Sequence, residues 1–388
     1  MDRPGQPQPR QSRQQSGIVL LPGSVVRGEQ LQLTPTLWEA VAVADRTLGA
    51  LEGYARALPD PESFAELMLL RESVRSNHLE GGQATLADLL WWRADPGHEE
   101  AVTTLRGELR VAANYVEAWD MGRETIAAQG YSTRLVRALH TQLFRRVRGR
   151  DSRPGELRDS EIWIGPAGST FETAWFVPPA PGLVADSMAA LQRFLTATDT
   201  PIAPSLKVAI GYYQLETIYP FVDGNGRVAR LVLSLLFSQQ TGVGASMLSF
   251  SDYFSRDRAE HFRQLQLVRE QGDWGSWFGY FLGALRVAAE DSLTIIEQVD
   301  KQRRRDEALI IEALGGASAP PALKLLAAMA SRPLQSVSTV REVTGRTFAN
   351  ANQLVGKLEG LGILREITGR KRNRRYCYAP LVDLLANT

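Results

Sequence analysis

Cysteine and histidine are scarce in this sequence of 388 residues. There is one cysteine, Cys377, and there are four histidines. A single cysteine excludes an internal disulfide framework, is typical of a reducing compartment, and is most simply a buried core thiol. No spacing of histidine and cysteine resembles a metal site. His78 and His140 are expected in core or helix-surface positions, and His98 and His261 have no recognisable partner pattern.

The chain also lacks a stretch that could enter a membrane. No run of about 18 apolar residues occurs. The first 17 residues, "MDRPGQPQPRQSRQQSG", are rich in Gln, Pro and Arg and carry no apolar stretch after their charges. We therefore predict a disordered tail rather than a signal peptide, and a cytoplasmic protein without a membrane partner.

An excess of charge of one sign is missing as well. The sequence has 44 Lys and Arg against 43 Asp and Glu, a formal net charge of +1. Any attraction to nucleic acid must therefore come from a local patch. The composition, 44% hydrophobic and 22% charged, is ordinary for a folded protein, and the length allows two or three domains.

Helical patterns fill most of the chain. "PESFAELMLLRESVRSNHLEGG" begins with Pro61 and Glu62 and ends on Gly81 and Gly82, as expected of a helix start and stop. Further on, Ile162, Trp163 and Ile164 form a β-favouring run, and a loop of Gly, Ser and Thr separates it from a second run, residues 175–177. These two runs predict an exposed β-hairpin.

The composition changes after "DKQRRRDEA", and residues 308–388 have the pattern of a separate module. Three helical segments, "PALKLLAAMASRP", "SVSTVREVTG" and "TFANANQLVGKLEGLG", precede a strand pair, "ILREIT" and "RYCYAP", around a basic turn. This order is typical of a winged helix-turn-helix domain.

The stretch "IYPFVDGNGRVAR", residues 218–230, combines a carboxylate, two glycines, an amide and two arginines. Asp-Gly and Asn-Gly pairs are common in hairpin turns, so the glycines alone prove little. The residues after the glycines favour a helix, because apolar side chains recur at the spacing of one helix face: Val228, Leu231, Val232, Leu235 and Leu236.

A glycine-rich loop at a helix N-terminus offers free N–H groups and a positive dipole end, which together bind phosphate. Arg227 and Arg230 lie three residues apart and can face the same helical turn. Asp223 is a hard oxygen ligand beside them and suits Mg²⁺, which proteins hold with one or two carboxylates plus substrate phosphates. The loop therefore predicts a cradle for a nucleotide polyphosphate and its metal.

At this point the sequence resembles a known family. "YPFVDGNGRVAR" is similar to the signature of Fic-domain proteins, His-Pro-Phe-x-(Asp/Glu)-Gly-Asn-Gly-Arg-x-x-Arg, at every defined position except the first. "PGELRDSEIWIG" and "FVPP" resemble the flap hairpin of the family, and "SNHLEGGQ" fits its inhibitory pattern through Ser76, Glu80 and Gly81. The resemblance extends over about residues 35–295, and a winged helix after a Fic core is a familiar arrangement.

The resemblance implies a mostly α fold: a Fic-type helical core with a β-hairpin flap, followed by a winged helix-turn-helix domain. The expected domains are a disordered tail 1–17, an N-terminal helical region 18–128 with the inhibitory helix, a Fic core 129–295, a linker or helix 296–320 and a winged-helix domain 321–388.

The activity that the family implies is transfer of AMP from ATP to a protein hydroxyl, with the motif histidine as general base. Asp223 would hold Mg²⁺, and Gly224, Asn225 and Gly226 would form the anion nest. Arg227 would contact phosphate. Arg230 would bind the γ-phosphate or pair with Glu80, although in isolation Glu80 is also simply a glutamate at an exposed helix end.

Three positions depart from the family. Tyr219 stands where the family has its histidine, and a phenol with a pKa of about 10 is roughly one part in a thousand phenolate at pH 7. Loss of the base costs about 10²–10⁴ in rate, so a packed aromatic that closes the pocket is the simpler interpretation of Tyr219. The family histidine one helical face earlier is Tyr212, and the usual asparagine near the nucleotide is Asp257.

The predicted wing is strongly basic. It carries Arg365, Arg370, Lys371, Arg372, Arg374 and Arg375 against one acid, Glu366. Such a wing can lie along a phosphate backbone. The third helical segment, "TFANANQLVGKLEGLG", is the candidate recognition helix and offers side chains that reach base edges: Asn350, Asn352, Gln353 and Lys357. The sequence fits a second interpretation equally well. In it the winged helix contacts a partner protein or a second copy of the chain, and the basic turn is simply solvated.

Two functions therefore remain open. The first is a Mg²⁺-dependent adenylyltransferase that uses ATP to modify a protein target and is impaired or atypical because of Tyr219. The second is a catalytically silent Fic core that senses a nucleotide and regulates DNA or partner binding through the winged helix.

Overall fold

The computed structural model describes residues 33–94, 105–147, 153–166, 168–199, 202–240, 242, 244–371 and 373–387. The predicted disordered tail, His98 and Arg372 lie outside these ranges. The described chain is mostly helical, as predicted, with one small sheet. None of its described helices is long and apolar enough to cross a membrane.

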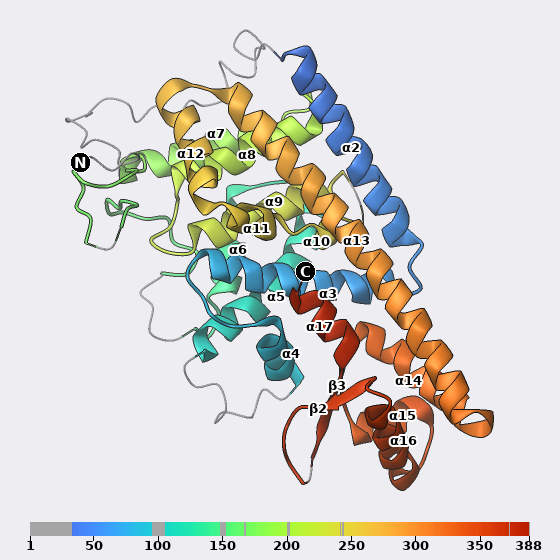
Figure 1. Cartoon of the computed structure of the whole chain (residues 1–388). Helices are drawn as coiled ribbons and strands as arrows, with labels where there is room; N and C mark the ends of the chain where they lie inside the picture. Colours follow the sequence, from blue (N-terminus) through green and yellow to red (C-terminus); the bar gives the residue numbers. More distant parts are fainter. Residues whose placement is uncertain are drawn as a thin grey trace, which may run out of the picture. The chain divides into compact units, whose positions relative to one another are not determined.

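The chain forms two compact units, and each is assembled from several stretches of sequence. Of the described residues, the first unit contains those within 33–45, 117–240 and 257–284, and the second contains those within 46–116, 241–256 and 285–387. Three helices run from one unit into the other: α2 (Pro35–Arg56), α5 (Arg106–Gln129) and α13 (Trp274–Leu314) (Figure 1). The linear domain boundaries expected from the sequence stay a prediction.

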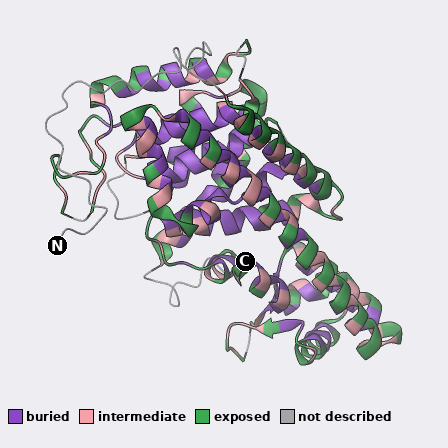
Figure 2. Cartoon of the chain, turned by 45° about the horizontal axis from the view of Figure 1, so that its top comes forward, coloured by how far each residue is buried: buried purple, intermediate pink, exposed green. Residues whose placement is uncertain are grey.

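The first unit is built around two helices whose side chains are almost all buried (Figure 2). These are α8 (Pro204–Ile218) and α9 (Asn225–Ser238). Proline at the first helical position starts α8 and also α7 (Pro181–Thr196), where a missing N–H costs nothing. α6 (Thr133–Leu143) packs against α9, and α7 packs against α8. α12 (Arg258–Gln271) belongs to the same unit.

The flap is less regular than predicted. Among the described residues of this stretch, the hairpin has one antiparallel bridge, between Ile164 and Phe176, instead of two three-residue strands. The N–H of Ile164 donates to the carbonyl of Phe176 at 2.8 Å, and the N–H of Phe176 donates back at 3.1 Å. Trp163 and Trp175, which flank the bridge, are about half exposed. With so little buried apolar surface, nothing extends the pairing.

In the second unit, α3 (Pro61–Leu79) is the central helix, and it lies where the sequence predicts. The side chain of Asp60 caps its N-terminus, and Glu80 and the left-handed Gly81 (φ 87°) end it. Most of its residues are buried, charged ones included. It packs against α4 (Leu86–Ala94), α10 (Gly244–Met247), α11 (Phe250–Arg256) and α14 (Ala319–Ser331).

The C-terminal module, residues 316–387, follows α13 directly, and α13 is continuous to Leu314, so a helix fills most of the stretch 296–320 expected to be a linker or helix. The short 3₁₀ turn Gly316–Ser318 leads into α14, β1 (Leu334–Ser336), α15 (Val337–Thr344), α16 (Phe348–Gly360), β2 (Leu364–Glu366), β3 (Arg375–Tyr378) and α17 (Ala379–Asn387). The strands form an antiparallel sheet in the order β1-β3-β2, and Cys377 of β3 is opposite both Leu334 and Arg365. Cys377 is buried, as expected. Helices and strands follow one another as a winged helix requires, and that assignment stays an interpretation.

Candidate functional site

The chain reverses between α8 and α9 through two residues with left-handed backbone. Tyr219, the C-cap of α8, has φ 50° and ψ 63°, and Gly224, the N-cap of α9, has φ 79° and ψ 9°. A Cβ at Gly224 would lie 2.5 Å from Cε2 of Phe144, so both the backbone and the space require glycine. Tyr219 also has left-handed backbone although it carries a side chain, and this conformation is strained. Strained residues of this kind cluster at functional sites.

Asn225 braces this loop rather than pointing into it. Its Oδ1 accepts from the N–H of Phe221 and its Nδ2 donates to the carbonyl of Phe221, both at 2.8 Å. Only an amide supplies one acceptor and one donor in this way. Both polar atoms of the Asn225 side chain are therefore used within the loop. The predicted contact of Asn225 with an anion would have to come from its backbone N–H group.

His140, on α6, supports the same loop through hydrogen bonds of both ring nitrogens. The N–H of Gly155 donates to His140 Nδ1 at 2.8 Å, so Nε2 carries the proton and donates to the carbonyl of Asp223 at 2.9 Å. The imidazole stacks on Phe221 with ring centroids 3.9 Å apart. Burial lowers the pKa of His140 to about 4, which keeps the ring neutral and matches this arrangement.

The first turn of α9 presents positive charge and backbone donors together. No described side chain caps this helix N-terminus, where Gly224, Asn225 and Gly226 lie. Arg227 and Arg230 are both about 5% exposed, although each carries a full charge. The Arg227 guanidinium lies over the ring of Phe144, 5.3 Å from its centroid. A helix N-terminus with two buried arginines is suited to an anionic ligand.

Asp223 is the candidate metal ligand at this loop. Its side chain is 39% exposed, and Oδ1 accepts from the N–H of Gly224 at 2.6 Å and lies 3.3 Å from Arg227 Nη2. Among the described residues there is no group of three His, Cys, Asp or Glu side chains that could bind a metal by themselves. A partly exposed carboxylate beside the N-terminus of α9 nevertheless fits Mg²⁺, which takes its other ligands from phosphates and water.

Arg158 fixes the backbone of the turn that carries Tyr219. Its Nε donates to the carbonyl of Tyr219 at 2.9 Å, and Nη2 donates to those of Ile218 (3.3 Å) and Pro179. Nη1 donates to the carbonyl of Ser160 at 3.3 Å. This buried guanidinium joins both ends of the flap segment to the end of α8, even though burial lowers its pKa.

Arg269, on α12, brings a further positive charge to Tyr219. Its Nη2 donates to the carbonyl of Glu216 at 2.8 Å, and its guanidinium lies 3.6 Å from the ring centroid of Phe176 in the flap. Burial lowers the pKa of Arg269, and the tyrosines around it, Tyr219 included, act in the opposite direction. Arg269 therefore lies close enough to the Tyr219 phenol for the two groups to interact.

The other departures from the family pattern also have structural partners. The Tyr212 hydroxyl lies 3.2 Å from Nε2 of the buried His261. Burial, then the charges of Arg230, Arg269 and Arg258, lower the pKa of His261 to about 3. Asp257 caps α12, since its carboxylate accepts from the N–H of Glu260 at 2.9 Å. A nucleotide contact from Asp257 would have to share that carboxylate with the cap.

The predicted inhibitory motif lies at the end of α3 in the second unit. Ser76 is fully buried, Glu80 is exposed at the C-cap, and Gly81 supplies the left-handed residue that ends the helix. Glu80 and Arg230 belong to different units, so the pairing between them stays a prediction.

In the C-terminal module, Asn350, Asn352, Gln353 and Lys357 are all exposed on α16, as base-reading residues would need to be. Lys371 is exposed and Arg370 is half-exposed. Part of the predicted basic patch is neutralised, because Arg365 forms a bidentate pair with Asp383 at 2.6 and 3.1 Å.

Sequence reasoning missed the three side chains that hold the loop, Arg158, His140 and Arg269. A signal existed for His140, which falls on the buried face of α6 that is otherwise formed by Leu135, Val136, Leu139 and Leu143. A histidine on an apolar face needs partners. Arg158 and Arg269 carry no such signal, because their acceptors at the end of α8 are backbone carbonyls distant in sequence.

Comparison with known proteins agrees with this geometry. The profile of the Fic/DOC family matches residues 130–237, and the profile of the Fic/DOC family N-terminal region matches residues 38–124. The chain is 33% identical over 130 residues to protein adenylyltransferase fic-1 of Caenorhabditis briggsae, which covers 33% of this chain and 23% of that protein. It is 34% identical over 132 residues to protein adenylyltransferase Fic of Drosophila melanogaster, with 33% and 24% covered. The matched region is thus about a quarter of the length of these relatives.

Solved structures extend the likeness in fold. A Fic family protein from Desulfovibrio desulfuricans has a TM-score of 0.57 at 19% identity, over 90% of this chain and 97% of that one. A Fic domain containing signaling protein from Bacteroides thetaiotaomicron has a TM-score of 0.50 at 17% identity, over 65% and 97%. With the signature loop in its expected place at the start of α9, the chain belongs to the Fic/DOC family.

Proposed function

We propose that this chain is a nucleotide-binding Fic protein built as an adenylyltransferase, which transfers AMP from ATP to a hydroxyl of a protein target with Mg²⁺ as cofactor. The observation that carries the proposal is the stretch from Tyr219 to Arg230, which brings together a helix N-terminus without a side-chain cap, two buried arginines and the partly exposed Asp223. The names of the sequence relatives support the type of reaction.

In this proposal the loop binds the polyphosphate through backbone N–H groups and the two guanidinium groups. Arg227 and Arg230 are already desolvated, so a phosphate gains strong interactions without a further cost of removing water from the arginines. Asp223 would hold the metal, which neutralises phosphate charge when bound. The bracing by Asn225 and His140 keeps the N–H groups oriented before the nucleotide arrives.

Tyr219 determines whether the site turns over. The attacking hydroxyl needs a proton acceptor, and an ordinary phenol is a poor one at pH 7. The positive charge of Arg269 lies near the phenol, but phosphates of a bound nucleotide would bring the opposite charge to the same place. We therefore expect nucleotide binding to be retained and transfer to be slow, with Glu80 as a further brake through Arg230.

A second candidate is a catalytically silent core whose C-terminal module binds DNA. The specific observations in its favour are the tyrosine at the position of the base and the row of exposed polar residues on α16, from Asn350 to Lys357. Lys357→Gln and Lys371→Gln should then weaken binding to duplex DNA and reduce its salt dependence, whereas Lys301→Gln, on the exposed side of α13, should not. Absence of DNA affinity at low salt, with or without ATP, would eliminate this candidate.

The decisive experiment compares four proteins, wild type, Tyr219→His, Glu80→Gly and the double variant, with α-labelled ATP and Mg²⁺. Transferred label reports turnover, and calorimetric titration with ATP reports binding. Tyr54→His, a substitution at an exposed tyrosine of α2, is the matched control and should change neither.

We expect all four proteins to bind ATP and the double variant to transfer most label, with a gain of about 10²–10⁴ from the histidine. Activity of Glu80→Gly without the histidine would mean that Tyr219 itself serves the chemistry. Loss of ATP binding in every variant would reject the proposal.

A further inference from the structure

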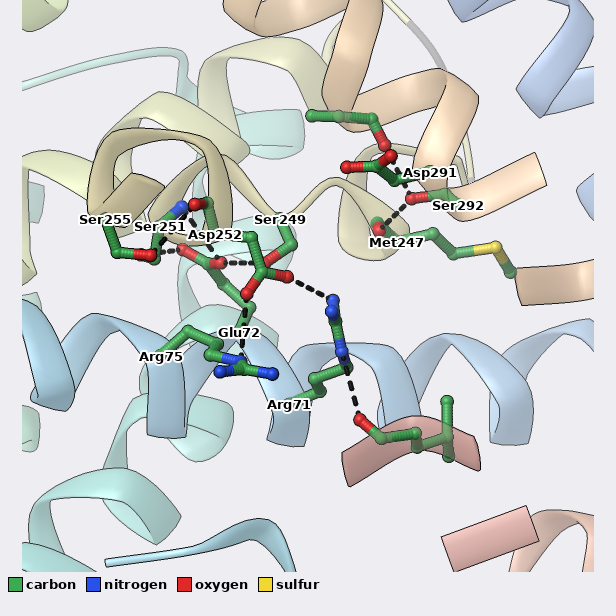
Figure 3. A network of polar contacts seen from close by, with 12 residues as sticks. Arg71, Glu72, Arg75, Met247, Ser249, Ser251, Asp252, Ser255, Asp291 and Ser292 are labelled. Atoms are coloured by element: carbon green, nitrogen blue, oxygen red, sulfur yellow. Dashed lines mark hydrogen bonds and ion pairs between the residues drawn. The ribbon is translucent and has the colours of Figure 1, made fainter. Parts of the chain in front are cut away.

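A second group of charged residues lies away from the signature loop, on the buried face of α3 (Figure 3). Arg71 is 3% exposed and Glu72 is 2% exposed. Asp252, on α11, forms ion pairs with Arg71 and with Arg75, the latter at 2.9 Å. The two arginines, Glu72 and Asp252 carry no net charge together, which makes their burial acceptable.

Glu72 ties α3 to the segment that leads into α11. Its carboxylate accepts from the hydroxyl groups of Ser249 at 2.7 Å and Ser251 at 2.5 Å. Ser292 of α13 in turn donates to the carbonyl of Met247 at 2.7 Å. The segment 247–252 is therefore held on both sides, and a shift of α3 has to move it or break these bonds (Figure 3).

The same arginines hold the end of the C-terminal module. Arg71 Nε donates to the carbonyl of Leu385 at 3.2 Å, and Arg75 Nη2 lies 3.5 Å from that of Ala386. The last four carbonyls of a helix lack intrahelical partners and carry negative dipole charge. Because both acceptors belong to the last turn of α17, two arginines of α3 act as a C-cap for a helix more than 300 residues away.

Other elements of the C-terminal module also pack against α3 and α4, the helices on either side of the predicted inhibitory motif. α17 and β1 pack against α4, which begins just after the inhibitory motif, and α14 packs against α3. α15 and α16 pack on each other and on the module's own sheet and α14, and Asn350, Asn352 and Gln353 on α16 are exposed. A partner could reach the module there while α17 still contacts α3.

We propose that the C-terminal module regulates the nucleotide site through α3: Arg71 and Arg75 couple the docked position of α17 to the position of Glu80, and undocking of the module weakens the inhibition. This inference rests on the proposed function, because it needs Glu80 to inhibit. Arg75 is adjacent to Ser76 and one and a half turns before Glu80, so a shift of the arginines is transmitted along a continuous helix. Asp252 lies five residues before Asp257 in the chain, which gives the same residues a second route to the candidate site.

Arg71→Lys tests the coupling in the full-length protein. A lysine keeps the charge and can hold Asp252 or the carbonyl of Leu385, but not both in the geometry of a guanidinium. Arg75→Gln, at a side chain that is 30% exposed, is the second variant in case the buried substitution prevents folding. Arg93→Lys is the matched control, because Arg93 pairs with Glu66 of α3 at 2.6 Å in the same unit.

The readout is ATP affinity with Mg²⁺, measured in the wild-type and Glu80→Gly backgrounds, together with hydrogen exchange of residues 76–82 and 379–387. In the wild-type background we expect Arg71→Lys or Arg75→Gln to tighten ATP binding by about fivefold and to speed exchange in both segments. In the Glu80→Gly background the same substitution should leave affinity unchanged, since the inhibitor is already gone. Arg93→Lys should do neither.

Equal effects in both backgrounds, or no effect while Glu80→Gly alone tightens binding, would overturn the coupling and leave the proposed function standing. If Glu80→Gly itself leaves ATP affinity unchanged, the inhibitory role of Glu80 and this inference both fail.

Discussion

At the scale of single residues, Arg158 makes the position of Tyr219 depend on a residue from the flap segment. One guanidinium satisfies the carbonyls of Ser160, Pro179, Ile218 and Tyr219, and its own backbone N–H donates to the carbonyl of Pro220 at 2.9 Å. Because buried carbonyls need hydrogen-bond donors, this side chain holds the turn and the flap entrance together.

We predict that Arg158→Lys lowers the free energy of unfolding by about 2 kcal/mol, because an ammonium group cannot reach four carbonyls in a fixed fork. Urea denaturation of the wild type and the variant checks this. Arg193→Lys, at an exposed position of α7, should change stability by less than about 0.5 kcal/mol. Equal stability of the Arg158 variant and this control would show that the clamp contributes little.

His261 offers a residue whose burial should appear in the pH dependence of stability. Its pKa falls from the ordinary 6.5 to about 3 in the folded protein, through burial and the charges of Arg230, Arg269 and Arg258. The unfolded chain then binds more protons below pH 6.5, so the stability is complete above that pH and is lost as the pH falls.

Between pH 7.5 and pH 5, we predict that the free energy of unfolding of the His261→Gln variant falls by about 2 kcal/mol less than that of the wild type. Urea midpoints of both proteins across this range provide the measurement. The wild-type curve should fall more steeply on acidification. Parallel curves would mean that His261 keeps an ordinary pKa in the folded state.

At the scale of elements, the start of α9 depends on one glycine for two separate reasons, left-handed backbone and the space beside Phe144. We predict that Gly224→Ala costs about 2–4 kcal/mol, of which about 1–2 is backbone strain, and abolishes ATP binding. Gly272→Ala is the matched control, because Gly272 has φ 67° at the end of α12 and open space around it.

The control should lose only the strain, about 1 kcal/mol, and bind ATP normally. Thermal and urea denaturation give the two costs, and calorimetric titration gives the affinity. Equal costs at Gly224 and Gly272 would show that Phe144 moves aside and that space does not limit this turn.

Much of this architecture could be predicted from local patterns. The start and stop of α3, the opening of a buried helix after "DGNG", and the order of elements in the C-terminal module all follow from caps, glycines and apolar periodicity. The flap forms the predicted exposed hairpin with one bridge among its described residues, because Trp163 and Trp175 are about half exposed and bury little apolar surface.

The support of the site could not be predicted in the same way. The bonds from Arg158 and Arg269 to the end of α8, and from Arg71 to α17, reach carbonyls between 53 and 314 residues away, and no local pattern reports such contacts. Likewise, periodicity shows that α3 is a helix but not that it is buried on most sides, since charged residues such as Glu72 are expected to face solvent until their partners are known.

At the scale of the whole molecule, three continuous helices, α2, α5 and α13, belong partly to each compact unit. A unit that unfolded alone would have to break all three in the middle and expose backbone and apolar groups at each break. The units are therefore expected to unfold together, in contrast to domains joined by a flexible linker.

We predict a single calorimetric unfolding transition whose midpoint rises with ATP and Mg²⁺. At about 100 times the dissociation constant the ligand adds roughly 2.7 kcal/mol, and this stabilisation should appear throughout the chain although the signature loop lies in the first unit. Hydrogen exchange at saturating ATP checks the second part, because α4 and α14, which belong wholly to the second unit, should gain protection in their slowest amides. Two separate transitions, with only the first unit shifted by ATP, would show that the shared helices break independently and would leave the C-terminal module without an energetic connection to the nucleotide.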